Sequence, residues 1–537
     1  MDFEYPYEFS SRRSAVQARN GMVATSHPLA ARTGLRVLED GGTAADAAVA
    51  TAAVLNVVEP HNIGVGGDMF ALTHFDGEYE ALNGSGGAPA AASVEAYRER
   101  TDATEDGDPV VPTEGGLAVT VPGALGAWQA LLDRYGERDL CDLLGPAARY
   151  AREGFPVSEV VAREWGGSEE RLREHDEDGT FLVDGRTPEV GETVRNPAFA
   201  DTLERIAAEG PDLLYGGALG ESVVETVRED GGLLSLEDLA GYEPEWTDPV
   251  TATYGDLEVL EHPPNGQGTI ALEALNVAAR FDLPAEVTNP DRLHHLIEAM
   301  KVAFADGYEY ISDPAKTDVP LETMLSPAYA AERAAEIGHR AGTYASSAGP
   351  DSDTAYLSVV DGDGNAVSFI NSLYWGFGSA LTTDGFALQN RGSSFSLDPD
   401  HANSVEPGKR PFHTIIPAML RDADTGAFRA AWGVMGGSMQ PQGHLQVVAN
   451  LADGLNPQAA LDAPRFRWLE DRRVAVETER VPESVVTDLR GRGHRVVEGP
   501  DYRSEGGAWG GGQVIWYEDG TLVGGSEPRK DGCAVGY

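Results

Sequence analysis

Two short segments of the sequence carry residue types that suit acyl-transfer chemistry. Thr354 stands directly before a predicted strand, where its hydroxyl could act as a nucleophile. The segment Gly436-Gly437-Ser438 lies between a predicted strand and a predicted helix. Backbone N–H groups at such a turn can hold a developing oxyanion, and the helix dipole adds to the attraction. The local pattern alone favours a structural interpretation, with Thr354 as the start of a strand and the glycine pair as a tight turn.

Both segments belong to regions with strong strand signals. Alternating apolar residues at 356–360 and 366–370, joined by Asp-Gly-Asp-Gly-Asn, predict a β-hairpin that begins two residues after Thr354. A second hairpin is predicted at 513–517 and 521–523, and a strand at 428–434 leads into the glycine pair and then into a helix at 442–451. The second half of the chain is therefore expected to supply mostly antiparallel strands.

Helices are predicted earlier in the chain. The first covers 28–40, and the second, 43–57, begins at Thr43, whose hydroxyl can form a capping box with Asp46. A third, 292–310, contains His294, His295 and Glu298 without the H-E-x-x-H order of a zinc site, so these are interpreted as ordinary helix-face residues and no metal is expected. Helices followed by antiparallel strands indicate an α+β fold.

The composition excludes several functional classes. The 537 residues include 87 Asp+Glu and 40 Lys+Arg, for a net charge of −47, yet 41% are hydrophobic, so the chain can fold around a large core. An acidic protein is repelled by nucleic acid and by anionic membranes, and neither is an expected partner. Because carboxylates recur along the whole chain, the sequence indicates a hydrated surface suited to high salt, and we expect a halophilic protein.

The sequence gives little sign of disulfide bonds or membrane spans. Its two cysteines, Cys141 and Cys533, support no disulfide framework or thiolate metal cluster, and we expect both to be buried small residues. The longest apolar stretch, 47–58, is too short to cross a bilayer, and the N-terminal residues lack a secretory signal pattern. A cytoplasmic location is therefore expected.

From Gly21 to the C-terminus the chain resembles the γ-glutamyltransferase (γ-glutamyltranspeptidase) family of N-terminal-nucleophile (Ntn) hydrolases. The resemblance rests on many segments in the same order. They are Gly21-Met22-Val23-Ala24, 41–50 (GGTAADAAVA), 64–70 (GVGGDMF), 263–268 (PPNGQG), 298–301 (EAMK), Asp353-Thr354, 359–361 (VVD), 364–367 (GNAV), 408–411 (GKRP), Gly436-Gly437-Ser438 and 463–466 (APRF).

This resemblance implies a four-layer αββα sandwich and a precursor that cleaves itself between Asp353 and Thr354. Residues 1–353 would form the large subunit and 354–537 the small subunit, both in one domain. Once Thr354 is N-terminal, its own α-amine, with a pKa of roughly 7.7 to 8.0, can accept the hydroxyl proton. The resemblance further assigns Gly436 and Gly437 to the oxyanion and Ser372 to support of the nucleophile, with no cofactor.

Several positions depart from the family pattern in the expected substrate pocket. The family's arginine for the substrate α-carboxylate is absent from Gly84-Ser85-Gly86-Gly87-Ala88-Pro89, and its acidic stretch is replaced by Arg391-Gly392-Ser393-Ser394-Phe395. The substrate-binding candidates are Ser85, Tyr374, Arg391, Ser394, His413 and Thr414. Arg391 could select an acyl group with a carboxylate and no α-amine; alternatively, it faces solvent or pairs with a surface carboxylate.

The predicted function is that of a Thr354 amidohydrolase or acyltransferase that cleaves γ-glutamyl-type amides such as glutathione, with hydrolysis or transfer to an amine. Two alternatives stay open. One is a non-glutamyl amidohydrolase of the cephalosporin-acylase kind, and the other is an uncleaved, non-catalytic binding homologue.

Overall fold

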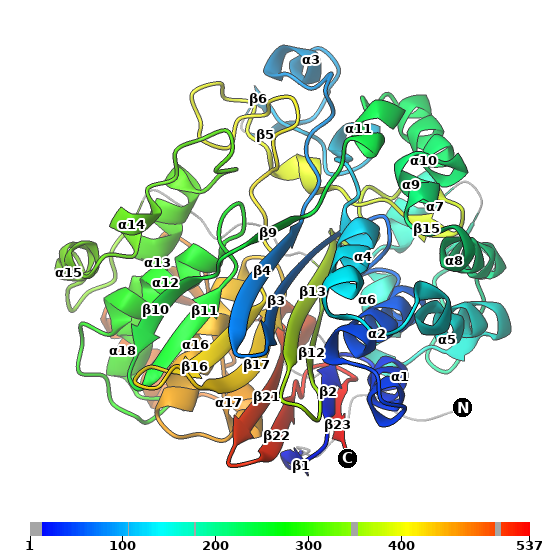
Figure 1. Cartoon of the computed structure of the whole chain (residues 1–537). Helices are drawn as coiled ribbons and strands as arrows, with labels where there is room; N and C mark the ends of the chain where they lie inside the picture. Colours follow the sequence, from blue (N-terminus) through cyan, green and yellow to red (C-terminus); the bar gives the residue numbers. More distant parts are fainter. Residues whose placement is uncertain (1–12, 106, 177–178, 345–352, 500–505) are drawn as a thin grey trace.

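The computed structural model describes residues 13–105, 107–176, 179–344, 353–499 and 506–537, with the side chain of Asp353 outside the description. Two seven-stranded antiparallel sheets pack face to face, and helices cover the outer face of each sheet (Figure 1). The predicted α+β fold with four αββα layers is confirmed.

The first sheet holds Thr354 near its centre. Its strands, in spatial order, are β23 (Cys533–Gly536), β2 (Met22–Thr25), β12 (Asp353–Val360), β13 (Ala366–Tyr374), β3 (Asp68–Phe75), β4 (Glu78–Gly84) and β9 (Glu245–Thr247). The second sheet contains β1 (Val16–Ala18), β22 (Thr521–Ser526), β21 (Gly511–Glu518), β17 (Phe428–Met435), β16 (Ala418–Asp422), β11 (Leu257–Glu261) and β10 (Val250–Tyr254). Both predicted hairpins are present, as β12–β13 and β21–β22.

Each sheet takes strands from both sides of the Asp353–Thr354 bond. In the first sheet, β12 pairs with β2 on one side and with β13 on the other, and β13 in turn pairs with β3. In the second sheet, β11 pairs with β16. Residues 1–353 and 354–537 therefore share their sheets and cores rather than forming separate folding units.

The helices begin and end close to the predicted positions. Helix α1 covers Pro28–Glu39 and α2 covers Ala44–Val58, with the predicted capping box between Thr43 and Asp46. All residues of α2 are buried, because it packs under the first sheet and beside α4 (Ala124–Tyr135) and α5 (Leu140–Glu153). On the other side, α12 (Gly268–Ala278), α13 (Pro290–Tyr310) and α16 (Met439–Ala452) cover the second sheet.

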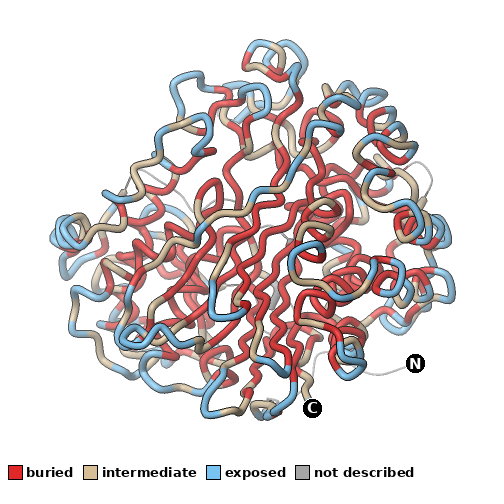
Figure 2. The backbone as a smooth tube through the Cα atoms, viewed as in Figure 1, coloured by how far each residue is buried: buried red, intermediate tan, exposed pale blue. Residues whose placement is uncertain are grey.

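Three apolar layers hold these elements together. One lies between the first sheet and its helices and one between the second sheet and its helices. The third lies between the two sheets and includes Leu72, Leu260, Met419 and Ile515. Figure 2 shows the buried central strands and the exposed outer turns of the helices. Burial of this apolar area, at about 25 cal/mol per Å², is the main stabilising contribution.

One expectation about the cysteines is wrong. Cys141 is exposed on α5 and Cys533 is half-buried on the edge strand β23, and both thiols are free. Cys141 lies at the second position of an amphipathic helix whose buried face is carried by other residues, so its small size did not decide its burial. Within the described residues, no helix is both long and apolar enough to cross a membrane.

Candidate active site

Thr354 lies at an irregularity in the pairing of β12 with β13. Asp353 is opposite Tyr374 and Ala355 is opposite Asn371, so two residues of β13, Ser372 and Leu373, face the single residue Thr354. Such a β-bulge redirects side chains at the end of a strand. It brings the Thr354 hydroxyl to 3.2 Å from the Ser372 hydroxyl, which it donates to. Thr354 is 2% exposed.

The end of β13 is held by the same serine. The backbone N–H of Tyr374 donates to Ser372 Oγ at 2.8 Å. Tyr374 has φ +81°, a left-handed conformation that costs free energy for a residue with a Cβ. The hydrogen bond to Ser372 helps to maintain this conformation, and the ring of Tyr374 contacts Arg391.

The glycine turn lies where β17 from the second sheet meets the start of β12. Met435 packs in one cluster with Tyr356, two residues beyond Thr354. A Cβ at Gly433 would come within 2.5 Å of the Tyr356 ring, so β17 and β12 approach closely. The residues after Met435, Gly436 and Gly437, therefore lie beside the start of β12.

The backbone of this turn can donate hydrogen bonds. Gly436 and Gly437 have φ of +120° and +53°, which favour glycine. The Gly437 carbonyl accepts from Gln267 Nε2 at 2.9 Å and from the backbone N–H of Gln440, so it is fixed in place. In the described part of the chain, the N–H groups of Gly436 and Gly437 donate to no other group. Together with the N-terminus of α16, they can stabilise an oxyanion.

A buried cation lies on the other side of Tyr374. The guanidinium carbon of Arg391 lies 4.1 Å from the centre of the Tyr374 ring, in cation–π contact, and Nη1 donates to Thr414 Oγ1 at 2.9 Å. Nη2 has no hydrogen-bond partner among the described residues. Burial lowers the pKa of Arg391 to about 10, so the side chain stays charged at neutral pH. The alternative that Arg391 faces solvent is wrong, because its side chain is 0% exposed.

The partners of this arginine are also buried. Asp68 Oδ2 lies 3.6 Å from Arg391 Nε and 3.2 Å from His413 Nε2. The backbone N–H of Ile415 donates to His413 Nδ1, so His413 carries its proton on Nε2 and donates it to Asp68. Burial raises the pKa of Asp68 to about 7 despite the nearby Arg391, whereas burial and Arg391 hold the pKa of His413 well below its usual value. Asp68 is thus the titratable group of the cluster near neutral pH.

Ser85 links this cluster to a surface cavity. Its hydroxyl accepts from Asn265 Nδ2 at 3.3 Å, and Gly86, its neighbour, donates a backbone N–H to Asp68 Oδ1. Ser85 also lines a cavity of about 580 Å³ whose wall includes Tyr242 and Trp246. The position without the expected arginine therefore borders open space.

One other predicted substrate-binding position, Ser394, is structural. Ser394 donates its hydroxyl to the carbonyls of Arg391 and Phe412 and so fixes the turn that carries Arg391. On α13, His294 lies within reach of Glu298 and His494, while Lys301 Nζ donates to Glu298 Oε1 at 2.7 Å. His294 Nδ1 also bonds His494 Nε2 at 2.8 Å, whereas His494 Nδ1 has no hydrogen-bond partner among the described residues. His295 bonds the Asp291 carbonyl instead.

Three residues that hold the site together have no role predicted from the sequence. They are Asp68, Asn265, which bonds Ser85 and the Pro411 carbonyl, and Gln267, which bonds the carbonyls of Thr414 and Gly437. All three lie inside segments that match the family, 64–70 and 263–268. Buried polar residues in glycine-rich segments were the available signal.

The αββα sandwich with a threonine at the start of a central strand defines an Ntn hydrolase. The family model described as gamma-glutamyltranspeptidase matches residues 30–537. The chain belongs to this family, and it is an amidohydrolase or acyltransferase of the Ntn type.

Relatives whose names describe different activities are similar to this chain over nearly its whole length. The chain is 39% identical to the glutathione hydrolase-like YwrD proenzyme of Bacillus subtilis over 96% of this chain and 98% of that protein. It is 34% identical to the acylase ACY 1 proenzyme of a Pseudomonas species over 98% and 95%. The crystal structure of cephalosporin acylase from Bacillus halodurans matches with a TM-score of 0.93 and 45% identity, over 100% of this chain and 99% of that one.

Proposed function

We propose that the chain is a precursor that cleaves itself between Asp353 and Thr354, and that Thr354 then cleaves γ-glutamyl-type amides through an acyl-enzyme. The observation that carries this proposal is the pair of hydroxyls at the bulge, Thr354 Oγ1 and Ser372 Oγ, 3.2 Å apart. The names of these relatives, which call them proenzymes, support the processing step.

The chemistry follows from one residue with two functional groups. In the precursor, the Thr354 hydroxyl attacks the carbonyl carbon of Asp353, an ester forms as the Asp353–Thr354 peptide C–N bond breaks, and the Thr354 nitrogen takes up the hydroxyl proton. Water then hydrolyses this ester, which leaves Asp353 with a carboxylate and Thr354 with a free hydroxyl and a free α-amine. That amine accepts the hydroxyl proton when Thr354 attacks the substrate amide. The N–H groups of Gly436 and Gly437 hold the oxyanion, the amine product leaves with the proton, and water or an acceptor amine takes the acyl group.

The charged cluster is proposed to hold the acyl group. Arg391 contacts the ring of Tyr374, the last residue of β13, and the same strand carries Ser372. Arg391 Nη2 has no hydrogen-bond partner in the described chain. An arginine of this kind suits a carboxylate. A γ-glutamyl group and a glutaryl group both carry a carboxylate, so both fit this part of the proposal.

The second candidate is a non-glutamyl acylase, favoured by Ser85 in place of the family's arginine. A chromogenic γ-glutamyl anilide, a glutaryl anilide and a butyryl anilide, assayed at molar KCl and at low salt, separate the two. Glutamyl turnover at least equal to glutaryl turnover supports the first candidate, and glutaryl turnover without glutamyl turnover supports the second. Faster turnover and slower unfolding at molar KCl would support the proposed halophilic character.

A further inference from the structure

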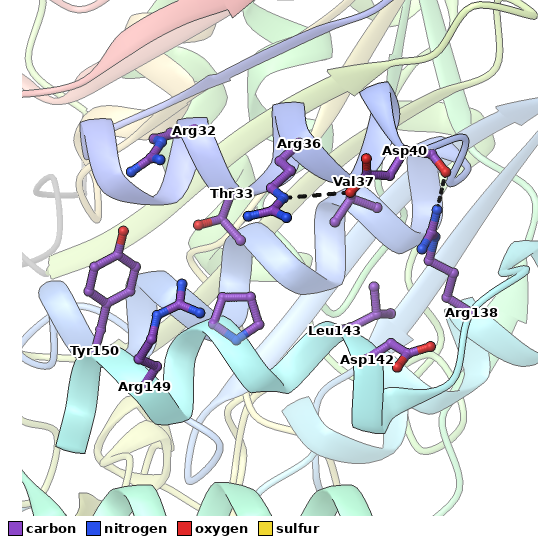
Figure 3. A pocket seen from close by; sticks show the side chains of 11 residues that line it. Arg32, Thr33, Arg36, Val37, Asp40, Arg138, Asp142, Leu143, Arg149 and Tyr150 are labelled. Atoms are coloured by element: carbon purple, nitrogen blue, oxygen red, sulfur yellow. Dashed lines mark hydrogen bonds and ion pairs between the residues drawn. The ribbon is translucent and has the colours of Figure 1, made fainter. Parts of the chain in front are cut away.

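A cavity of about 380 Å³ lies between α1 and α5, and arginines line it from several directions (Figure 3). Arg32 and Arg36 come from α1, Arg138 from the loop before α5, and Arg149 from α5 itself. Two carboxylates, Asp40 and Asp142, also line the cavity, so basic groups outnumber acidic ones here. The whole chain shows the opposite balance, with 40 Lys+Arg and 87 Asp+Glu. No residue of the candidate active site lines this cavity.

Two of these arginines have structural partners. Arg138 donates to the backbone carbonyl of Asp40, the residue that ends α1, and so caps that helix. Arg36 Nε lies 3.5 Å from the Asp40 carboxylate, an exposed pair one helical turn apart that contributes little to stability. Figure 3 shows both interactions at the same end of the cavity.

The other two arginines have no such partner. Within the described residues, Arg32 and Arg149 form no hydrogen bond or ion pair with a carboxylate, and Arg149 only approaches the Tyr150 ring at 5.7 Å. Asp142 also lines the cavity, but in the described chain it forms no ion pair with Arg32 or Arg149. Two guanidinium groups without a carboxylate partner among the described residues therefore line one cavity, and such groups can bind an anion.

The rest of the lining consists of the polar side chains of Thr33 and Asp142 and of an apolar and aromatic wall. Val37 comes from α1, Leu143 and Pro146 come from α5, and Tyr150 stands at the end with Arg149. A volume of this size is within the range of small-molecule sites, about 300–1,000 Å³. Long polyanions such as nucleic acids would meet the acidic surface around the cavity, so the ligand must be small.

We propose that this cavity binds a small organic phosphate, with the phosphate between Arg32 and Arg149 and the organic part against Val37, Leu143 and Pro146. Arginine binds phosphate through paired N–H groups, which favours phosphate over a simple halide ion. The apolar wall gives a ligand with a ring an advantage over inorganic phosphate.

Titration calorimetry on the full chain tests this site, with ADP, pyrophosphate and adenosine as probes at a fixed KCl concentration. We expect ADP to bind more tightly than pyrophosphate, and adenosine to bind at least tenfold more weakly than ADP. The double variant Arg32→Gln/Arg149→Gln should weaken ADP binding at least tenfold. The control Arg19→Gln/Arg495→Gln removes the same charge from exposed positions elsewhere and should leave binding unchanged.

Three results would overturn the proposal. They are absence of ADP binding to the unaltered chain, an equal loss of binding in the two double variants, and pyrophosphate binding as tight as ADP binding. Because ligand binding raises the unfolding temperature of the folded state, the ADP-induced shift in each variant gives a second measurement that also reports whether the variant folds. Amidase activity is assayed separately, so this site and the proposed reaction can fail independently.

Discussion

The two sides of Tyr374 differ in how they use charge. On the nucleophile side, Thr354 and Ser372 supply hydroxyls, and the turn at Gly436 supplies backbone N–H groups. On the acyl side, Asp68 and Arg391 are both fully buried with His413 beside them. Neutral groups can be held in a dry site at small cost, whereas buried charges destabilise the fold unless they are paired. The buried charges are therefore best explained by a ligand that carries a charge of its own. The neutral groups around Thr354 suit a reaction that requires no charged side chain.

The largest expected effect is loss of the nucleophile. Thr354→Ala should lower amidase activity at least about 10⁴-fold, because the hydroxyl forms the acyl bond. It should also prevent processing, so a denaturing gel should show one band near 57.0 kDa instead of fragments of 353 and 184 residues. Thr354→Ser keeps a hydroxyl and should still be processed. Processing in the alanine variant would contradict the proposed role of Thr354, and a single band for the unaltered chain would favour a non-catalytic homologue.

The next effect belongs to the charged side and should depend on the substrate. Arg391→Gln should raise KM for a glutaryl anilide about 100-fold, since loss of one partner of a buried charge pair costs about 2–5 kcal/mol. KM for a butyryl anilide, which lacks the carboxylate, should change little. Arg421→Gln, in an ion pair with Glu258 between β16 and β11 of the second sheet, is the matched control. Equal losses with both substrates would mean that Arg391 only supports the fold.

A smaller effect should come from the neutral side. Ser372→Ala should lower kcat about tenfold with little change in KM, because one hydrogen bond to the nucleophile contributes about 1–2 kcal/mol. Ser368→Ala is the matched control, since Ser368 is a buried serine of the same strand that bonds Tyr356 and the Trp432 carbonyl instead. If both variants lose the same activity, Ser372 supports the strand rather than the nucleophile.

The neutral side was more predictable from the sequence than the charged side. Alternation, a turn signal and a strand-to-helix glycine pair placed Thr354 and Gly436 on their elements, because these signals are local. The bulge at Ser372 depends on how two strands of one hairpin pair, and the contact of Asp68 with Arg391 joins residues more than 300 positions apart in sequence. A local pattern cannot show such a contact, and for Arg391 it could not distinguish a buried side chain from one that faces solvent. The resemblance to the family identified the segments but not which side chains meet.

The smallest effect tests the acyl side by pH. With its pKa raised to about 7 by burial, Asp68 is ionised above that pH, where it neutralises Arg391, and protonated below it. Arg391 is then uncompensated at low pH, so KM for a glutaryl anilide should fall about three- to tenfold between pH 8 and pH 6. His413 stays neutral throughout this range because its pKa is held well below the usual value.

Asp68→Asn should give a low, pH-independent KM, whereas Asp46→Asn, at another buried carboxylate, should keep the slope. Since the Thr354 amine titrates in the same range and acts on kcat, KM is the quantity that isolates Asp68. A slope that persists in Asp68→Asn, or that appears equally with a butyryl anilide, would show that the charged side does not sense the substrate carboxylate through this pair.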